Sequence, residues 1–336
     1  MTAVFFATNR NPNRKQNPTD FGATFSPEGL DELRFGWAEV PEDPDGEITV
    51  ATATERLSNR PPSRQVLGSR AVFEHLWHKM AKHERDTMVY VHGFDFTFRE
   101  ALRRTAELKR WYGANGKPMN WVVFTWPSDG RKTPVKSYRS DRKDAEASGT
   151  AMGRGILKAA DFVRDLQRAQ FCGQRVHLMA HSMGNFALRH AVQGMRAFVG
   201  DQLPRLFDEV LLMAADADND ALTTDAKLAP LEGLARRVTT YYNAQDLALV
   251  VSDWTKMNPD RLGASGPRDL DPLPPKFINI NCAAAVDWGT DPTGHQYYRN
   301  NAVVRRDVLA VLAGSEDDRI DGRTPITGRK QTYRVG

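Results

Sequence analysis

Short apolar runs alternate with longer amphipathic stretches along most of the chain. The runs are rich in β-branched and aromatic residues, as is typical of strands covered on both faces. They span residues 88–91, 121–126, 176–180, 210–214, 238–242 and 277–281. Between them apolar residues recur at helical spacing, as in Phe98, Leu102 and Ala106. This alternation predicts an α/β fold, with a mostly parallel sheet and helices on both of its faces.

Three further apolar stretches, at residues 3–10, 33–40 and 47–54, precede this alternation, and no helical pattern separates the last two. They predict an antiparallel N-terminal edge on the same sheet, which then has about eight strands in one domain. We expect this domain to span residues 1–314.

Three segments fall outside these patterns. Residues 127–150 and 252–276 lack apolar periodicity and are predicted as possible cover segments over the site. Residues 315–336 are polar and contain glycine, so they are predicted as a loosely held C-terminal tail.

Composition narrows the class of protein. The 336 residues are 40% apolar and 26% charged, and no apolar run approaches the roughly 20 residues that a membrane helix needs. The start of the chain lacks a signal-peptide pattern and the only cysteines are Cys172 and Cys282, so we expect a cytoplasmic protein without a disulfide framework. The net charge of +4 is mixed along the chain without an RNA-binding motif, which argues against a nucleic-acid partner. Oligomeric state is left open.

A serine stands where a predicted buried strand meets a predicted helix, in "LMAHSMGNFAL" at 178–188. A sharp turn there lifts the serine hydroxyl above the carboxyl edge of the sheet. Such a turn requires small residues two positions before and after the serine, because larger side chains would collide with the strand and the helix. Ala180 and Gly184 meet this requirement, giving the nucleophile elbow G-x-S-x-G with alanine at its first glycine. The alternative is that Ser182 is an ordinary helix N-cap.

Another predicted strand ends in "VYVHGFDF", where Gly93 permits a tight turn. The N–H groups of Phe94 and Met183 are the predicted oxyanion hole, which commonly contains two donors. His92 is expected to bond the backbone and shape this loop rather than to transfer protons.

A serine nucleophile needs a base and an acid that orients the base. Among eight histidines, His295 alone follows the last predicted strand, in a loop that can place its ring over a neighbouring strand end. Asp246 directly follows a strand and is the predicted acid. Asp216 and Asp218, one strand earlier, remain candidates.

The motifs "ATNRNP", "VHGF" and "AHSMG", in this order, resemble those of the α/β-hydrolase superfamily. The sequence is particularly similar to a bacterial, esterase/lipase-like branch of that superfamily whose function was unknown. The order Ser182, Asp246, His295 matches the chain order of the α/β-hydrolase triad. Ala180 replaces the usual first glycine of the elbow, as in other members.

These observations predict a serine hydrolase that cleaves carboxylic esters through an acyl-enzyme, with a small-molecule or acyl ester as substrate. No cofactor is required, and no metal-ligand spacing stands out. The same residues also serve thioesterases, peptidases and acyltransferases, and a non-catalytic binding protein on the hydrolase fold is the alternative from another class.

Overall fold

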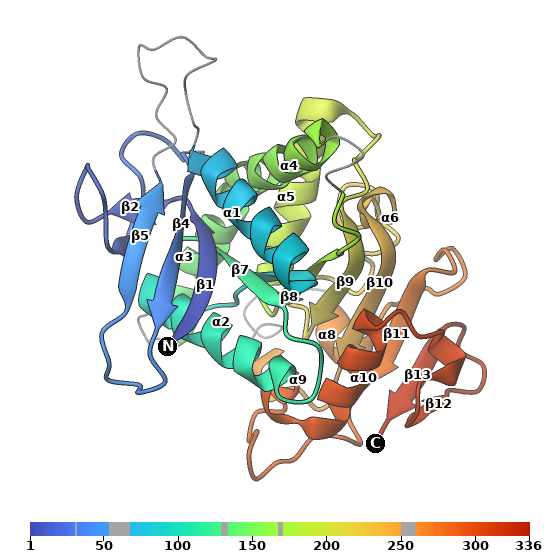
Figure 1. The fold of residues 1–336 in the computed structure, drawn as a ribbon. Coiled ribbons are helices and arrows are strands. Elements are labelled where there is room, and N and C mark those ends of the chain that lie inside the picture. Colours follow the sequence, from blue (N-terminus) through green and yellow to red (C-terminus); the bar gives the residue numbers. More distant parts are fainter. Residues whose placement is uncertain (31, 54–67, 129–133, 167–170, 250–259) are drawn as a thin grey trace. The chain divides into compact units, whose positions relative to one another are not determined.

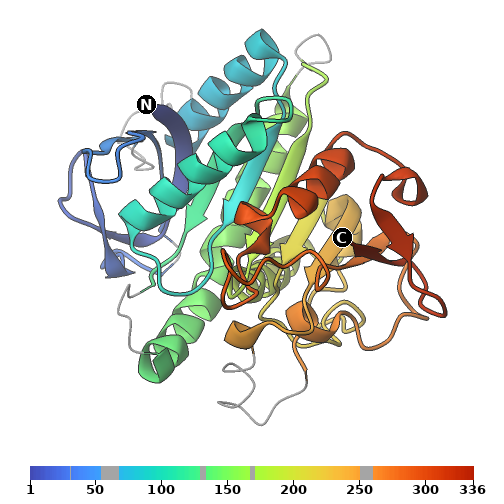
Figure 2. The same ribbon diagram turned by 90° about the horizontal axis from the view of Figure 1, so that it is seen from below.

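The computed structural model describes residues 1–30, 32–53, 68–128, 134–166, 171–249 and 260–336. The chain divides into two compact units, Met1–Val176 and His177–Gly336. Figures 1 and 2 show the first unit in blue to green and the second in yellow-green to red.

The N-terminal unit contains a sheet in which parallel and antiparallel pairing meet at one strand. Its strands are β1 (Thr2–Thr8), β4 (Arg34–Val40), β5 (Thr49–Ala53), β6 (Thr87–Val91) and β7 (Asn120–Thr125). β1 pairs in parallel with β7, and β7 with β6, whereas β1 with β4 and β4 with β5 are antiparallel pairs. The predicted antiparallel N-terminal edge is therefore confirmed. A short hairpin of β2 (Arg10–Pro12) and β3 (Phe21–Phe25) follows β1.

Helices cover both faces of this sheet. Adjacent side chains of a strand point to opposite faces, and Phe5 of β1 packs edge-on against His75 of α1 (Gly68–His83) with ring centroids 5.3 Å apart. The next residue, Phe6, packs on Phe98 of α2 (Phe98–Gly113) at 5.1 Å. α1 and α2 therefore lie on opposite faces, as Figure 2 shows.

The predicted cover segment 127–150 is mostly helical where the structure describes it. α3 (Pro134–Ala147) occupies most of it and α4 (Gly149–Asp165) follows. α3 differs from the prediction because it is almost entirely polar, so it carries no apolar stripe that periodicity could detect. In the other cover segment, 252–276, residues 252–259 lie outside the described residues, and the remainder contains α8 (Leu262–Ser265).

The C-terminal unit contains a second run of parallel strands. These are β8 (Val176–His181, beginning at the unit boundary), β9 (Phe207–Met213), β10 (Ala235–Tyr242), β11 (Phe277–Asn281) and β13 (Thr332–Val335), each parallel to the next, with β12 (Arg323–Pro325) antiparallel to β13. Because β8, β9 and β10 are parallel, their carboxyl ends meet at one edge of the sheet. The predicted strands agree with β8 to β11 to within three residues at each end.

Helices also flank the strands of this unit. They are α5 (Gly184–Val199), α6 (Leu231–Leu234), α8, α9 (Tyr297–Asn300), α10 (Ala302–Leu312) and the 3₁₀ turn Asp317–Arg319. Tyr241 of β10 donates a hydrogen bond to Asp307 of α10, whereas its neighbour Tyr242 lies against Gly266 at the end of α8. α10 and α8 therefore lie on opposite faces of β10.

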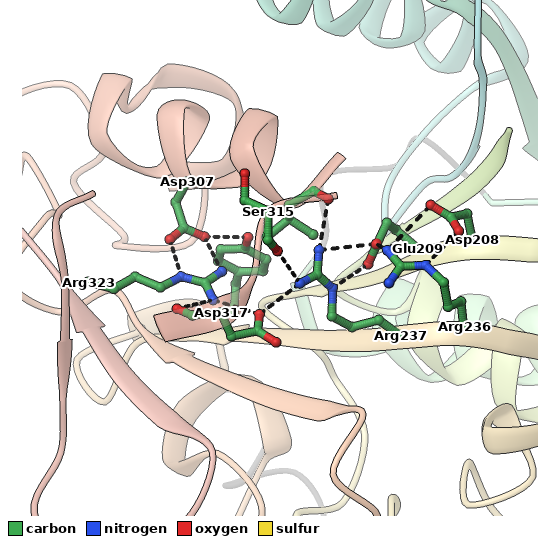
Figure 3. Close-up of polar contacts among 10 residues, drawn as sticks. Asp208, Glu209, Arg236, Arg237, Asp307, Ser315, Asp317 and Arg323 are labelled. Atoms are coloured by element: carbon green, nitrogen blue, oxygen red, sulfur yellow. Dashed lines mark hydrogen bonds and ion pairs between the residues drawn. The ribbon is translucent and has the colours of Figure 1, made fainter. Parts of the chain in front are cut away.

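Residues 315–336 are not a loosely held tail. They contain β12 and β13, and β13 pairs with β11. The side chains that hold them form a chain of ion pairs (Figure 3). Arg237 joins Glu209 at 2.8 Å to Asp317 at 2.9 Å, and Arg323 joins the same Asp317 at 2.9 Å to Asp307 at 2.6 Å. These contacts link residues far apart in the sequence, so composition alone gives no sign of them.

Substitution of Arg323 is the most direct test of these ion pairs, because Arg323 is 1% exposed and contacts two carboxylates. Arg323→Gln leaves Asp307 buried without its cation, and we expect the free energy of unfolding to fall by about 3–5 kcal/mol. Arg319→Gln is the matched control, since Arg319 is 77% exposed and pairs with Glu316, itself 65% exposed. A loss of less than about 1 kcal/mol is expected. Urea denaturation measures the free energy of unfolding of both variants. Equal losses would show that the buried Arg323 ion pairs contribute no more stability than an exposed pair.

Candidate active site

Ser182 lies in the turn between β8 and α5, as the sequence predicts. Its φ of 53° is in the left-handed region, which non-glycine residues adopt only where the surroundings enforce it. Its N–H donates to the Met213 carbonyl at 3.0 Å, and its own carbonyl accepts from the Asp216 N–H at 3.1 Å. The residue is 8% exposed and therefore almost buried. The turn is thus strained and closely held.

The alternative of an ordinary N-cap serine does not fit. Met183 occupies the N-cap position of α5, and no side chain caps it. Asn185 instead holds the turn, because its amide donates to the carbonyls of Ala180 and Ser182 at 3.1 Å each. Asn185, which was not predicted from the sequence, is fully buried in the first turn of the helix.

The structure brings His295 and Asp246 together. Their side chains come from separate loops, and Nδ1 of His295 lies 2.6 Å from Oδ2 of Asp246. Asp246 is fully buried, and its other oxygen accepts the N–H of Leu249 at 3.1 Å. Since a carboxylate only accepts, Nδ1 carries the ring proton and Nε2 is left with its lone pair.

Backbone contacts fasten the two loops to each other. The Leu247 backbone N–H donates to the Thr293 carbonyl at 2.9 Å. The side-chain amide of Asn243 donates to the Gly294 carbonyl, also at 2.9 Å. Gly294 has a φ of 65°, and a Cβ there would stand 2.6 Å from the Asn243 amide nitrogen, so glycine is required. Asp246 and His295 are therefore positioned by paired backbone as well as by their own bond.

Asp291 shapes the turn that presents His295. One of its oxygens accepts the His295 N–H at 3.2 Å, and the other accepts the Gln296 N–H at 2.6 Å. A role for Asp291 was not predicted from the sequence, although "DPTGH" carries a turn signature in its aspartate, proline and glycine.

His181 connects the elbow to the His295 loop. Its ring stands 4.7 Å from the His295 ring and stacks on Tyr298 at 4.3 Å. Its Nε2–H donates to the His295 carbonyl at 3.2 Å, which brings the residue before Ser182 into contact with the loop. Within the described residues, no hydrogen bond joins the Ser182 hydroxyl to His295, and such bonds are often long in ligand-free enzymes.

The surroundings of His295 shift its protonation. Burial disfavours the charged ring, but the Asp246 charge and hydrogen bond, together with the charges of Asp216 and Asp291, raise the pKa of His295 above its usual value. A carboxylate that stabilises imidazolium is the arrangement that a histidine base uses.

Asp216 and Asp218, the alternative acids, have other partners. Buried Arg261 lies 3.4 Å from Asp216 and 2.7 Å from Asp218. Asp218 also pairs with Lys227 at 2.8 Å, and despite its burial these cations lower the pKa of its carboxyl. Neither residue hydrogen-bonds to His295 within the described part of the chain.

The two predicted oxyanion donors lie in different units. Met183 is fully buried at the start of α5, and Phe94 is half-buried in the loop after β6. Among the described residues, none accepts a hydrogen bond from either N–H. His92 lies fully buried beside Phe94 with Nδ1 2.8 Å from the Gly93 carbonyl, which confirms that it bonds the backbone.

Across the residues that the structure describes, no group of three or more histidine, cysteine, aspartate or glutamate side chains is arranged to hold a metal ion. No helix in the same residues has the length and apolar character to cross a membrane.

Parallel strands flanked by helices, with a serine raised on a strand–turn–helix bend, define an α/β hydrolase. Residues 69–311 match the family described as "Alpha/beta hydrolase of unknown function (DUF900)". The match covers more than two thirds of the chain, which therefore belongs to this family. The predicted fold class and the resemblance to a hydrolase branch of unknown function are both confirmed.

Similarity to one solved structure is remote. The chain is similar to the phospholipase PlaB from Legionella pneumophila, solved in complex with thio-NAD, with 16% identity and a TM-score of 0.24. The similarity covers 58% of this chain but only 37% of that phospholipase. No curated protein matches the chain.

The His295 environment gives a prediction that does not depend on activity. We expect the pKa of His295 to lie above about 6.5. Asp246→Asn removes the leading cause of the increase while burial remains, so the pKa should fall below that value. Because folding raises this pKa, the pair adds stability that is complete below about pH 6.5 and disappears as pH rises through the folded-state pKa.

NMR titration of the His295 ring protons measures both values. Asp225→Asn is the control, since Asp225 is 79% exposed and pairs with Arg196. An unchanged pKa in Asp246→Asn would show that Asp246 does not govern the ring.

Proposed function

We propose that this protein is a serine hydrolase that cleaves carboxylic esters, with Ser182 as nucleophile, His295 as base and Asp246 as orienting acid. The buried 2.6 Å contact between His295 Nδ1 and Asp246 Oδ2 carries the proposal. This contact selects the histidine tautomer whose free nitrogen can accept a proton. The strained turn at Ser182 supports the nucleophile.

The reaction follows from these roles. Ser182 Oγ attacks the ester carbonyl while His295 Nε2 takes its proton, and Asp246 stabilises the imidazolium that forms. His295 then returns the proton to the leaving alcohol, which departs and leaves Ser182 acylated. Water, deprotonated by His295, releases the acid and restores the serine.

The oxyanion of each tetrahedral intermediate needs fixed donors. The Met183 N–H adjoins Ser182 at the start of α5, where the helix dipole also favours negative charge. The Phe94 N–H is the second proposed donor, on the strength of the "VHGF" motif.

Ser182 itself provides the first test. We expect a fluorophosphonate probe to label the wild type and not Ser182→Ala, and only the wild type to hydrolyse p-nitrophenyl esters. Ser315→Ala is the control, because Ser315 is partly exposed and lies outside the proposed triad. This variant should be labelled like the wild type. A wild type that resists the probe would favour a non-catalytic hydrolase-fold protein. Parallel acyl-thioester, peptide and acyl-acceptor assays separate esterase from thioesterase, peptidase and acyltransferase.

The acid can be tested by three matched substitutions. Asp246→Asn keeps the shape but removes the charge and favours the wrong histidine tautomer, so kcat should fall by about 10³–10⁴-fold with little change in KM. Asp216→Asn and Asp218→Asn should each lower kcat by less than about tenfold, because Arg261 is their partner. Steady-state ester kinetics distinguish the three. If Asp216→Asn or Asp218→Asn abolished activity while Asp246→Asn kept a near-normal kcat, the orienting acid would instead be the aspartate that follows the preceding strand.

A further inference from the structure

A buried arginine lies beside the loop that carries Phe94. Arg10, from the "ATNRNP" stretch, is 1% exposed and donates to oxygens of four residues. Its Nε–H bonds the Thr125 hydroxyl at 2.9 Å, and its Nη groups bond the carbonyls of Gly22 at 3.1 Å, Ser128 at 3.2 Å and Phe96 at 2.6 Å. The guanidinium is thus built into the N-terminal unit through fixed acceptors.

The hydrogen bonds from Arg10 through Thr125 to His92 run in one direction. The Gly93 carbonyl can only accept, so Nδ1 carries the His92 ring proton and Nε2 is an acceptor. The Thr125 hydroxyl, which accepts from Arg10, therefore turns its own proton toward His92 Nε2, 3.2 Å away. The Trp126 N–H also donates to His92 Nε2, at 3.3 Å. Nε2 is therefore the acceptor, and Nδ1–H donates to the Gly93 carbonyl at 2.8 Å.

This last bond aims the Phe94 N–H. The Gly93 carbonyl and the Phe94 N–H belong to one planar trans peptide and point in opposite directions. Holding the carbonyl toward His92 therefore turns the N–H the other way. Within the described residues this N–H meets no acceptor.

The far side of the loop is held as well. Arg10 bonds the Phe96 carbonyl, while the Phe96 N–H donates to the Ser128 hydroxyl at 3.0 Å. The Asp95 N–H donates to the Asp141 carboxylate at 3.1 Å, and the Ser128 hydroxyl donates to the same carboxylate. Asp95 has a φ of 65°, so the turn is strained and depends on these contacts.

The charges keep this arrangement constant near neutral pH. Burial and the Arg10 charge lower the pKa of His92 to about 3, so the ring stays neutral. Burial lowers the pKa of Arg10 to about 9, with Asp141, Glu100, Asp144 and Asp20 opposing the decrease, so the guanidinium stays charged.

We propose that Arg10 is a positioning residue for the oxyanion donor: through Thr125 and His92 it fixes the Gly93–Phe94 peptide, and through the Phe96 carbonyl it fixes the end of the same turn. The inference rests on the proposed function for the role of the Phe94 N–H. The direction of the hydrogen bonds from Arg10 to the Gly93 carbonyl does not depend on the proposed function.

The ¹⁵N chemical shifts of His92 test that orientation without any assay of activity. We expect the neutral Nδ1–H tautomer in the wild-type protein between pH 6 and 8. An Nε2–H tautomer would overturn the inference, because the ring could not then hold the Gly93 carbonyl.

Kinetics of paired Thr125 variants test the consequence. Thr125→Val keeps the shape of the side chain but breaks the link from Arg10 to His92, and kcat for a p-nitrophenyl ester should fall about 10- to 100-fold with KM nearly unchanged. Thr125→Ser restores the hydroxyl and should restore most of kcat. Thr105→Val is the matched control, since Thr105 is fully buried and, in the part of the chain that the structure describes, its hydroxyl bonds only the Ala101 carbonyl of its own helix. It should leave kcat unaltered.

Rates are normalised to the fraction of folded protein, measured by circular dichroism. Equal kcat values for Thr125→Val and Thr125→Ser would overturn the positioning role. A wild type without hydrolytic activity would refute the proposed function and with it the role of Phe94, while the His92 tautomer would still decide the orientation.

Discussion

The arrangement of the candidate site depends on one buried hydrogen bond, between His295 Nδ1 and Asp246 Oδ2. A buried carboxylate is costly unless its oxygens are satisfied. Here His295 occupies one oxygen and the Leu249 N–H the other. The bond therefore compensates for burying Asp246, selects the tautomer of His295 and joins the two loops that carry them. Removing either partner would leave the other buried group without its main compensation.

Buried arginines are stabilised in two different ways in this protein. In the C-terminal unit, Arg237 and Arg323 each meet carboxylates directly, so desolvation is offset by opposite charge. In the N-terminal unit, Arg10 is surrounded mainly by carbonyl and hydroxyl oxygens, with the nearest acids acting from further away. The N–H donors of a guanidinium lie in one plane, so the four groups that accept from Arg10 are held in fixed directions. Such a group is suited to orienting a loop.

Sequence patterns predicted the parts of the molecule whose cause is local. Buried strands were visible as continuous apolar runs, and the elbow was visible because a sharp turn restricts Ala180 and Gly184 to small residues. The choice of His295 and Asp246 needed only their places after strands, and the structure brings the two together. The positions of α3 and of residues 315–336 were not predictable in this way. Their stability comes from polar contacts between distant residues, for which no periodic pattern exists.

Backbone strain at the elbow is shared with the neighbouring strand end. Ser182 and Ala214 both have positive φ, at 53° and 44°, and such residues cost on the order of 1–3 kcal/mol each. The Ala214 N–H is shared between the Tyr241 carbonyl and the Tyr297 hydroxyl, both at 3.1 Å, and Tyr297 also donates to Tyr241 at 2.9 Å. Tyr297 stands two residues after His295, so the side chain that holds the strained strand end also anchors the His295 loop. A movement of the His295 loop would therefore break the hydrogen bond that Tyr297 makes to the strained Ala214. The loop and this strand end are held in place together.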